Sequence, residues 1–404
     1  MYWEFANRLK KLPPYLFVEI DNMKREARRK DMDLINLGIG DPDFETPEPI
    51  VNEMKKAISD PENQHYPLGE GLIEFRKAAA IWCRKRFNIN LDPEDEILAL
   101  IGSKEGLGHV PMAFINPGDV VLVPNPAYPV YNSATIFAEG IPYMMPLFAE
   151  NDWLPDLSKV PQSILKKTKM MFLNYPNNPT SAIANKNFFG EVVRFAKKYN
   201  IIICHDAAYS EIYFDNKKPV SFLEISGAKD VAIEFHSLSK TFNMTGWRIG
   251  FAVGNKNLIK GLAKVKSNLD SGVFHAIQKA SIVALNLPQK ITDDIRKIYE
   301  DRRNFFANEL QKIGWKVQKS SASFYFWIKI PDKYGSSSTS FAKLLLEKYG
   351  IVATPGVGFG KYGEGYIRMT ITAEKARLKE AVNRLRGLGD CPRFTERSSS
   401  GTRQ

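Results

Sequence analysis

Cysteine, histidine and long apolar stretches are scarce in this chain of 404 residues. Its three cysteines, Cys83, Cys204 and Cys391, are far apart and odd in number, so we expect no disulfide framework. We expect Cys83 and Cys204 to be packed thiols, which fits a reducing cytoplasm. The five histidines lack metal-ligand spacing, so no metal site is predicted. No apolar run is long enough to span a membrane, and the first residues lack the basic and apolar regions of a secretory signal.

The excess of basic over acidic residues gives the chain a formal net charge of +11. Such a charge is compatible with nucleic-acid binding, but the basic side chains are interleaved with acidic ones, as in residues 24–31. Interleaved charge of this kind is typical of a solvated surface. We therefore predict no nucleic-acid partner, and the charge serves at most to attract anionic substrates.

From residue 97 onward, short apolar runs alternate with helical patterns, as in a parallel sheet with crossover helices. The predicted strands cover residues 97–101, 120–123, 170–174, 201–204, 231–235 and 249–254, with helices at about 72–87 and 188–199. After about residue 290 the pattern changes to a long helix followed by short strands at 324–330, 351–353 and 366–371.

These patterns predict an α/β fold with two domains. A large domain with a mainly parallel sheet takes residues 41–289. A smaller α+β domain combines residues 1–40, which include an N-terminal arm, with residues 290–388. Residues 389–404 are polar and have little to bury, so we expect them to be disordered.

Lys240 lies in the segment around which the chain is organised, residues 236–250, between two of the predicted strands. A lysine at the end of a buried strand loses solvation, so its pKa is expected to fall toward the free-amine form that a Schiff base requires. Ser237, Ser239 and Arg248 suit a phosphate, because they offer hydroxyl donors and a planar cationic fork. A solvated surface turn is the alternative for a lone lysine.

Other polar residues follow predicted strands, at the edge where ligands bind in open α/β sheets. Gly102, Ser103 and Lys104 begin a helix and offer backbone amides to an anion, although an ordinary helix cap is the more common explanation. Tyr128 lies in a turn and suits stacking on a planar ring, with a packed turn aromatic as the alternative. Gly40 would let the backbone approach a ligand closely.

Two charged residues in apolar surroundings require partners. Asp206 follows an apolar run and, once buried, needs a cation, unless it merely caps a helix. Arg368 lies on an otherwise apolar strand, where a substrate carboxylate would form a bidentate pair and a structural salt bridge is the alternative. Tyr209 and Asn178 are candidates to hydrogen-bond a phenolate oxygen of a bound ring.

Taken in order, these segments resemble the class I/II aminotransferases, which are pyridoxal-phosphate enzymes of fold type I. The string Ser-Leu-Ser-Lys-Thr-Phe-Asn-Met-Thr-Gly-Trp-Arg-Ile-Gly at 237–250 is the most specific part, and the resemblance extends over about residues 12–388. It implies that pyridoxal 5'-phosphate is bound covalently to Lys240 and that Asp206 pairs with its pyridine nitrogen. One departure is Ser181, which stands where the family usually has glycine and leaves the placement of Asn178 open.

The same resemblance implies roles for the other candidate residues. Asn178 and Tyr209 would hydrogen-bond the ring hydroxyl, and Tyr128 would stack on the ring. The catalytic residues would be Lys240, Asp206 and Tyr209. The residues that match the family's phosphate positions are Ser103, Lys104, Ser237, Ser239 and Arg248. Tyr66 matches a tyrosine that reaches the phosphate of the neighbouring subunit, so the resemblance implies a homodimer with shared active sites.

Within the family, the resemblance is greatest to the LL-diaminopimelate aminotransferases, through residues 12–17, 37–43, 102–106 and 205–211. It implies a ping-pong transamination in lysine biosynthesis that converts tetrahydrodipicolinate to LL-diaminopimelate, with glutamate as donor and 2-oxoglutarate as its product. The residues expected to contact substrate are Tyr15, Gly40, Lys104, Tyr128, Asn178, Asn268 and Arg368.

Alternatives remain at this level. Alanine- or aspartate-preferring aminotransferases share most of these motifs, and a lyase on the same fold would keep Lys240, Asp206 and Arg368. A transcription regulator would need an added DNA-binding domain, for which we see no room before Pro13. A non-catalytic binding protein is the least favoured class, because the lysine, aspartate and arginine are all present.

Overall fold

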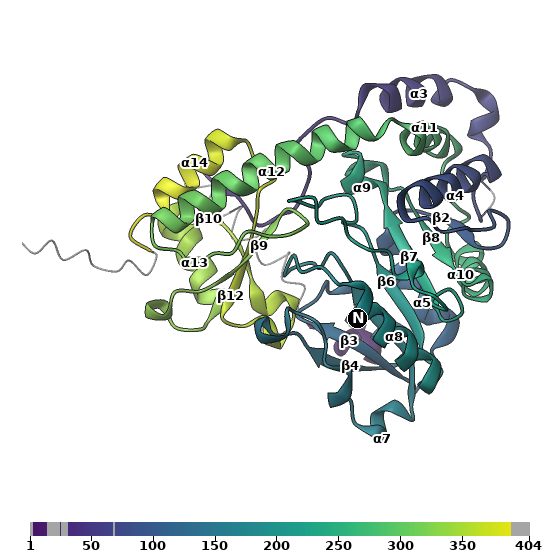
Figure 1. Cartoon of the computed structure of the whole chain (residues 1–404), viewed down its shortest axis with the longest axis horizontal. Coiled ribbons are helices and arrows are strands. Elements are labelled where there is room, and N and C mark those ends of the chain that lie inside the picture. Colours follow the sequence, from purple (N-terminus) through teal and green to yellow (C-terminus); the bar gives the residue numbers. More distant parts are fainter. Residues whose placement is uncertain (1–2, 14–24, 26–30, 68, 389–404) are drawn as a thin grey trace, which may run out of the picture.

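The computed structural model describes residues 3–13, 25, 31–67 and 69–388 (Figure 1). Of the sequence predictions, Tyr15, most of the N-terminal arm and the tail at 389–404 lie outside these residues. None of the helices in the described ranges is long and apolar enough to cross a membrane. Cys83 and Cys204 are buried free thiols, as predicted.

A seven-stranded sheet forms the centre of the larger part of the molecule (Figure 1). Its strands, in spatial order, are β2 (Ile97–Leu100), β8 (Gly250–Gly254), β7 (Ala232–Ser237), β6 (Ile202–Asp206), β5 (Thr168–Asn174), β3 (Val120–Asn125) and β4 (Ile141–Pro146). All neighbours are parallel except β8, which is antiparallel to both β2 and β7. The predicted, mainly parallel sheet is confirmed.

The strand β4 was not predicted, and its sequence explains why. It has the sequence Ile-Pro-Tyr-Met-Met-Pro and lies at the edge of the sheet, with most of its side chains partly exposed. Proline lacks a backbone donor and is tolerated at sheet edges, so an edge strand need not show the continuous apolar run of a central one.

Helices cover both faces of this sheet, as its apolar strands require. One face packs on α5 (Ser103–Phe114), α6 (Val130–Phe137) and α10 (Lys256–Leu269), with Leu107, Tyr131 and Leu262 in the shared core. The other face packs on α4 (Ile73–Phe87), α8 (Lys186–Tyr199) and α11 (His275–Asn286). The remaining helices of this part are α3 (Glu48–Ile58), α7 (Gln162–Leu165) and α9 (Leu238–Thr241), and α1 (Asn7–Lys10) lies near α6.

The predicted helix at 188–199 shows how sequence determines these elements. Helix α8 begins where the side chain of Asn185 accepts a hydrogen bond from Phe188 N, which is a standard N-cap. Phe188, Phe189, Val192, Val193 and Ala196 recur at helical spacing and are all buried. The helix ends at Asn200, whose φ of 54° is the left-handed conformation that closes many helices.

The second part of the molecule is built around α12 (Gln289–Lys312), a helix that extends across the top of the view from the sheet to the C-terminal elements (Figure 1). Strands β11 (Thr354–Pro355), β12 (Tyr366–Thr370) and β9 (Tyr325–Lys329) form an antiparallel sheet, and β1 (Ile35–Asn36) pairs with β10 (Ile351–Val352). The helices α13 (Ser338–Tyr349) and α14 (Lys375–Arg384) complete this part.

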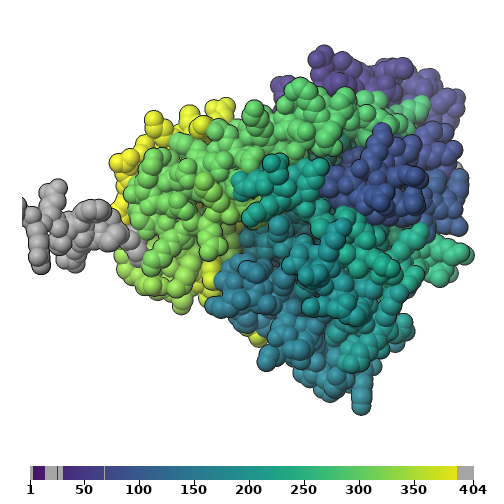
Figure 2. Space-filling model, in the orientation of Figure 1, coloured from purple at the N-terminus to yellow at the C-terminus, as the bar shows by residue number. Residues whose placement is uncertain are grey.

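The residues after 289 occupy one side of the molecule and the blue-to-teal residues the other (Figure 2). The core of the C-terminal part contains Ile35 and Leu37 from near the N-terminus, together with Phe326, Ile367 and Leu378. Tyr209 and Phe214, from the segment after β6, also pack into this core. The boundaries predicted at residues 40 and 289 stay a prediction, since the two parts share these contacts.

Candidate active site

A cavity of about 260 Å³ lies where the seven-stranded sheet meets the C-terminal part. Twelve of the residues predicted from the sequence line it, together with Ile39, Asn174, Ala208 and Tyr325. The predicted residues are Gly40, Ser103, Lys104, Tyr128, Asn178, Asp206, Tyr209, Ser237, Ser239, Lys240, Arg248 and Arg368. The structure therefore brings together residues that are up to 328 positions apart, Gly40 and Arg368.

The sheet positions these side chains at the carboxyl ends of neighbouring parallel strands. Asn174 and Asp206 are the last residues of β5 and β6 and are paired in register, and Ser237 is the last residue of β7. Because the backbone ladder is fixed by buried strands on both sides, these ends form a rigid platform. A ligand held there contacts several strands at once.

Lys240 lies in the four-residue helix α9, directly after β7. Its Nζ donates a hydrogen bond of 3.4 Å to the carbonyl oxygen of Gly40. Burial lowers the pKa of Lys240 to about 8; the nearby Asp41 opposes this, and Arg248 and Arg368 add to the lowering. Near neutral pH, far more of this amine is uncharged than of an ordinary lysine, so it is suited to act as a nucleophile or base.

One end of the cavity is rich in donors for an anion. Ser103 is the first residue of α5, so the free amides of that helix start are directed to this end. Ser237, Ser239 and Arg248 line the same cavity, and a Cβ on Gly102 would lie 2.4 Å from Arg248 Nη2. Glycine at 102 therefore leaves room for the guanidinium next to the helix start, as a phosphate site requires.

Asp206 also lines the cavity, and it lacks a cationic partner among the described residues. Its Oδ2 accepts a hydrogen bond from Tyr131 Oη at 2.8 Å, and its Oδ1 accepts one from Ala208 N at 3.1 Å. Burial raises the pKa of Asp206, although these hydrogen bonds act in the opposite direction. A cation supplied by a ligand would offset the cost of burying this carboxylate.

Arg368 is held by neutral groups rather than by a carboxylate. Its Nη1 donates to Asn178 Oδ1 and its Nη2 to the carbonyl of Gly38, both at 2.7 Å. Its Nε is buried and has no hydrogen-bond partner among the described residues. The guanidinium lies over the ring of Tyr325, with Cζ 4.1 Å from the ring centroid. No described carboxylate pairs with Arg368, so its charge remains available to an anionic ligand.

The hydroxyl group of Tyr209 contacts that of Tyr325 at the cavity. The two hydroxyl oxygens are 2.9 Å apart. Burial first, and then Tyr325, raises the pKa of Tyr209, so this phenol keeps its proton and can donate a hydrogen bond to a bound group. Gly40 is close to the same hydroxyl, because a Cβ at position 40 would lie 2.1 Å from Tyr325 Oη.

These features fit the cofactor that the sequence predicts. Lys104, Lys240, Arg248 and Arg368 line the cavity, and Asp206 is the carboxylate among its lining residues. The excess of positive charge suits a phosphate and a substrate carboxylate, and the isolated Asp206 suits a protonated ring nitrogen. Tyr128 is partly buried at the cavity wall, with Lys104 Nζ 5.9 Å from its ring centroid.

Two predicted residues are not part of this cavity in the single chain. The side chain of Tyr66 is 91% exposed, and Asn268 is exposed with its amide donating to the carbonyl of Lys264 at 2.7 Å. Tyr66 was predicted to act across a dimer, so its exposure does not test the prediction. Asn268 lies on the surface at the end of α10, so the substrate contact predicted for it stays a prediction.

Sequence reasoning missed three residues that the geometry selects: Tyr131, Asn174 and Tyr325. Asn174 ends β5 as Asp206 ends β6, so the strand-end pattern could have identified it. Tyr131 lies three residues after Tyr128, one helical turn away, and its contact with Asp206 depends on how α6 packs. Tyr325 lies on β9, and local sequence does not show that this strand reaches the cavity.

Ser181 stands where the family usually has glycine, and its backbone has a conformation that favours glycine. Its φ is +64°, in the left-handed region that glycine adopts without cost. A serine in this conformation bears a strain of about 1 kcal/mol or more. Nevertheless Asn178, three residues earlier, lines the cavity and contacts Arg368.

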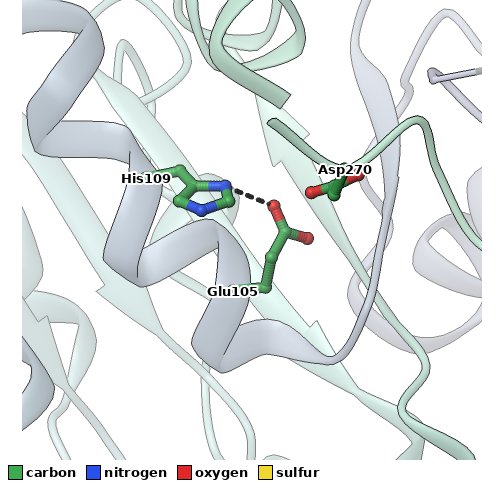
Figure 3. A group of neighbouring side chains, drawn as sticks. All are labelled: Glu105, His109 and Asp270. Carbon is green, nitrogen blue, oxygen red and sulfur yellow. Dashed lines mark ion pairs between the residues drawn. The ribbon is translucent and has the colours of Figure 1, made fainter. Parts of the chain in front are cut away.

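A cluster beside the cavity contains Glu105, His109 and Asp270, whose ligand-type atoms lie within 4.8 Å of one another (Figure 3). His109 Nδ1 is 2.8 Å from Glu105 Oε1. Lys266 is fully buried, and its Nζ contacts Glu105 Oε2 at 3.2 Å and Asp270 Oδ1 at 2.7 Å. This lysine already supplies a cation to both carboxylates, so the cluster is explained as an ion-pair tie between α5 and the end of α10.

Comparison with known proteins shows extensive similarity. The family described as aminotransferase class I and II matches residues 32–385. A protein of Aquifex aeolicus named LL-diaminopimelate aminotransferase is 54% identical over 386 residues, covering 96% of this chain and 99% of the relative. One of the same name from Syntrophobacter fumaroxidans is 53% identical, covering 95% and 98%. The substrate-bound structure of BacF from Bacillus subtilis has a TM-score of 0.92 at 37% identity, covering 95% and 98%. The predicted fold class is confirmed.

Proposed function

The chain belongs to the class I and II aminotransferases, and on that premise we propose that it transfers an amino group between glutamate and LL-diaminopimelate. In the biosynthetic direction, glutamate gives its amino group to tetrahydrodipicolinate, which yields LL-diaminopimelate and 2-oxoglutarate for lysine biosynthesis. The observation that carries this proposal is the identity of 54% and 53% to relatives of that name over nearly the whole chain.

The substrate that we propose makes specific demands on the cavity. LL-Diaminopimelate carries an amino group and a carboxylate at each of its two ends. Arg368 would bind the carboxylate at the reacting end, because its charge has no carboxylate partner among the described residues. Lys104, at the cavity wall, and Asn268 of the partner subunit would contact the distal end. Tyr15 and Gly40 would add contacts along the substrate.

The cofactor that we infer is pyridoxal 5'-phosphate, which the chain would hold at five parts of the molecule. Lys240 would bind it covalently, and Asp206 would form an ion pair with its ring nitrogen. Tyr128 would stack on the ring, and Asn178 and Tyr209 would hydrogen-bond its hydroxyl group. The residues that would bind its phosphate are Ser103, Lys104, Ser237, Ser239, Arg248 and, from a second subunit, the partner's Tyr66. When bound, the cofactor supplies an electron sink for negative charge at the substrate's α-carbon.

The chain's own residues then carry out proton transfer and orientation. Lys240 Nζ would take the proton from the α-carbon of the amino acid and return it later, a task that suits a pKa of about 8. Arg368 would fix the α-carboxylate by a charged bidentate pair, which holds the α-carbon in the cavity that Lys240 also lines. Asp206 would maintain the positive charge of the ring nitrogen that makes the ring an acceptor.

A homodimer with shared active sites is part of the proposal. It gives a role to Tyr66, an aromatic side chain that is 91% exposed in the single chain, and to Asn268, which is also exposed. Large exposed aromatic residues are often contact residues of an interface. We also propose that the protein acts in the cytoplasm, where glutamate and 2-oxoglutarate are its partners.

Product analysis tests the proposed reaction. The purified, cofactor-loaded protein is incubated with LL-diaminopimelate, with and without 2-oxoglutarate, and glutamate formation is measured. We expect glutamate and tetrahydrodipicolinate in equal amounts, and only when the acceptor is present in excess of the enzyme. Turnover without an acceptor would instead indicate elimination on the same fold. Lys240→Ala is the control, because it keeps the cavity but removes the proton-transferring amine.

A further inference from the structure

Ser181 and Ser323 lie 142 positions apart in the sequence but touch in the structure. Ser181 follows β5 in the loop that carries Asn178, and Ser323 lies two residues before the start of β9. Their hydroxyl oxygens are 2.6 Å apart, and the side chains are only 3% and 0% exposed. The contact thus joins the loop after β5 to the C-terminal part of the molecule, next to the cavity.

The hydrogens of this contact can be assigned from its neighbours. Ser181 Oγ donates to the carbonyl of Tyr325 at 2.8 Å, which uses its single hydrogen. The bond between the two serines must therefore be donated by Ser323 and accepted by Ser181. Tyr325 N in turn donates to Ser323 Oγ at 3.3 Å. The three groups form a closed ring of hydrogen bonds, in which each hydroxyl both donates and accepts.

Both serines are held in a backbone conformation that favours glycine. The φ angles are +64° for Ser181 and +57° for Ser323. Serine is strained in this region, whereas glycine is not, so the backbone alone gives no reason for a side chain at either position. The hydroxyl groups and their hydrogen bonds are what the two serines add.

The ring of hydrogen bonds fixes the backbone of Tyr325. Tyr325 in turn contacts Arg368, which would bind substrate, and Tyr209, which would bind the cofactor. Its ring lies under the guanidinium of Arg368, and its hydroxyl contacts that of Tyr209. Arg368 Nη1 is bonded to Asn178, on the same loop as Ser181. Tyr325 also lines a second cavity, of about 550 Å³, to which Ser181 contributes. Tyr325 therefore lines both cavities, and the serine contact holds its backbone.

We propose that Ser181 and Ser323 form a clasp, defined by these two hydroxyl groups, that positions Tyr325 and thereby Arg368 for the substrate's α-carboxylate. The two serines are positioning residues, since they line neither the phosphate site nor the reacting end. This inference rests on the proposed function, because Arg368 binds a substrate carboxylate only if the protein is an aminotransferase of this kind. Serine in place of glycine at position 181 then has a positioning role, which offsets the backbone strain that it causes.

The test compares wild type with Ser181→Gly, Ser323→Gly and the double variant. Glycine accepts the positive φ, so these variants remove the hydroxyl groups without adding strain. We expect KM for glutamate and for LL-diaminopimelate to rise by roughly three- to tenfold, as for the loss of one or two hydrogen bonds, with a smaller change in kcat. Because either substitution opens the ring, the double variant should be no more than about twofold worse than the poorer single one.

Three further measurements separate positioning from a general effect on folding. The dissociation constant of glutarate, a non-reacting dicarboxylate, should rise by the same factor as KM. Cofactor affinity should change by less than about twofold, because the clasp reaches the cofactor only through the contact of Tyr325 with Tyr209. Ser181→Ala also removes the hydroxyl but keeps the strain, so its melting temperature should fall below that of Ser181→Gly. Ser340→Ala removes an exposed hydroxyl pair with Ser337, 2.9 Å apart, and should leave KM unchanged.

The outcomes distinguish the clasp from the proposed function. If wild type transaminates but Ser181→Gly changes neither KM nor glutarate binding by more than about twofold, the clasp is overturned. Equal losses of cofactor affinity and glutarate affinity would overturn it as well, because the effect would then be one of the whole cavity. If wild type binds glutarate but does not transaminate, the proposed function fails, and the glutarate affinities of the variants still decide the clasp.

Discussion

Tyr131 donates a hydrogen bond of 2.8 Å to Asp206 Oδ2 beneath the floor of the cavity, where both side chains are buried. The phenol comes from α6 and the carboxylate from the end of β6, so the contact ties a covering helix to the sheet. Burial raises the pKa of Asp206, and this hydrogen bond counteracts the rise. Tyr131 therefore favours the ionised form of Asp206, which the proposed ion pair with a ring nitrogen would require.

The variant Tyr131→Phe tests this relationship. Loss of the hydrogen bond should raise the pKa of Asp206 further, so the charged carboxylate is stabilised less and the cofactor should bind more weakly. A hydrogen bond to a charged group contributes about 1.5–3 kcal/mol, which corresponds to a roughly ten- to hundredfold rise in the dissociation constant of the cofactor. Titration of the cofactor-free protein with the cofactor, followed by absorbance, measures this dissociation constant. Tyr299→Phe is the matched control, since Tyr299 Oη is buried without a partner among the described residues; equal effects of the two variants would contradict the account.

The lowered pKa of Lys240 gives a prediction for the cofactor-free protein. Because burial favours the neutral amine, the reactive form should accumulate as the pH rises through about 8 rather than about 10.5. The rate at which the cofactor's aldehyde couples to the protein should show this inflection, and a rate that keeps rising to pH 10.5 would refute it.

The same shift has a consequence for stability. The folded state disfavours the protonated lysine, so below a pH of about 8 the native protein bears a penalty that the unfolded chain lacks. Between about pH 8 and 10.5 the unfolded chain still binds the proton and the native state does not, so the free energy of unfolding should rise relative to Lys240→Met. Chemical unfolding of both cofactor-free proteins across this range measures the difference. A constant difference would show that the amine is not buried.

Gly40 should be intolerant of any side chain, because of the close hydroxyl of Tyr325. In Gly40→Ala the new Cβ would lie 2.1 Å from Tyr325 Oη, so the tyrosine must move. We expect kcat/KM to fall by at least about tenfold, in line with a core overpacking cost of about 1–3 kcal/mol. The double variant Gly40→Ala with Tyr325→Ala removes the hydroxyl and the ring carbons that would lie 2.1–2.5 Å from the new Cβ, so it should recover part of the loss relative to Tyr325→Ala alone. Simple additivity of the two losses would argue against the contact.

Subunit mixing tests the predicted role of Tyr66. Lys240→Ala and a Tyr66→Ala variant are each expected to have little activity as homodimers. If Tyr66 serves the neighbouring subunit's site, a mixed dimer contains one site with an intact Lys240 and an intact Tyr66 from the other chain. The mixture should then be clearly more active than either variant alone. No gain after subunit exchange, verified by differently tagged chains, would place Tyr66 outside the shared site.

The parts of this site that follow from the sequence share one physical origin. Lys240, Asp206 and Asn178 follow buried strands, and the carboxyl ends of parallel strands must meet at one edge of the sheet. Once the alternation of strands and helices is recognised, their proximity requires no further information. The edge strand β4 was not predicted from the sequence, because its prolines and its partly exposed side chains interrupt the apolar pattern.

Other parts depend on tertiary arrangement that local sequence does not encode. Tyr325 reaches the cavity only because the sheet of β9, β11 and β12 packs against the loop after β5. The sequence shows Ser181 as a departure from the family's glycine. Its contact with Ser323 becomes evident only in the folded structure, because the two residues are 142 positions apart. Tyr66 and Asn268 stay predictions, because their proposed contacts lie in a second chain.

The most direct measurement is spectral, on purified protein loaded with pyridoxal phosphate and titrated separately with LL-diaminopimelate, glutamate, alanine and aspartate. We predict that LL-diaminopimelate and glutamate convert the yellow cofactor band to that of the amino form, and that alanine and aspartate do not. Rapid conversion by alanine or aspartate, with no response to LL-diaminopimelate, would contradict the proposed substrate. Absence of a yellow band in wild type, or its persistence in Lys240→Ala as a covalent adduct, would contradict the assignment of Lys240.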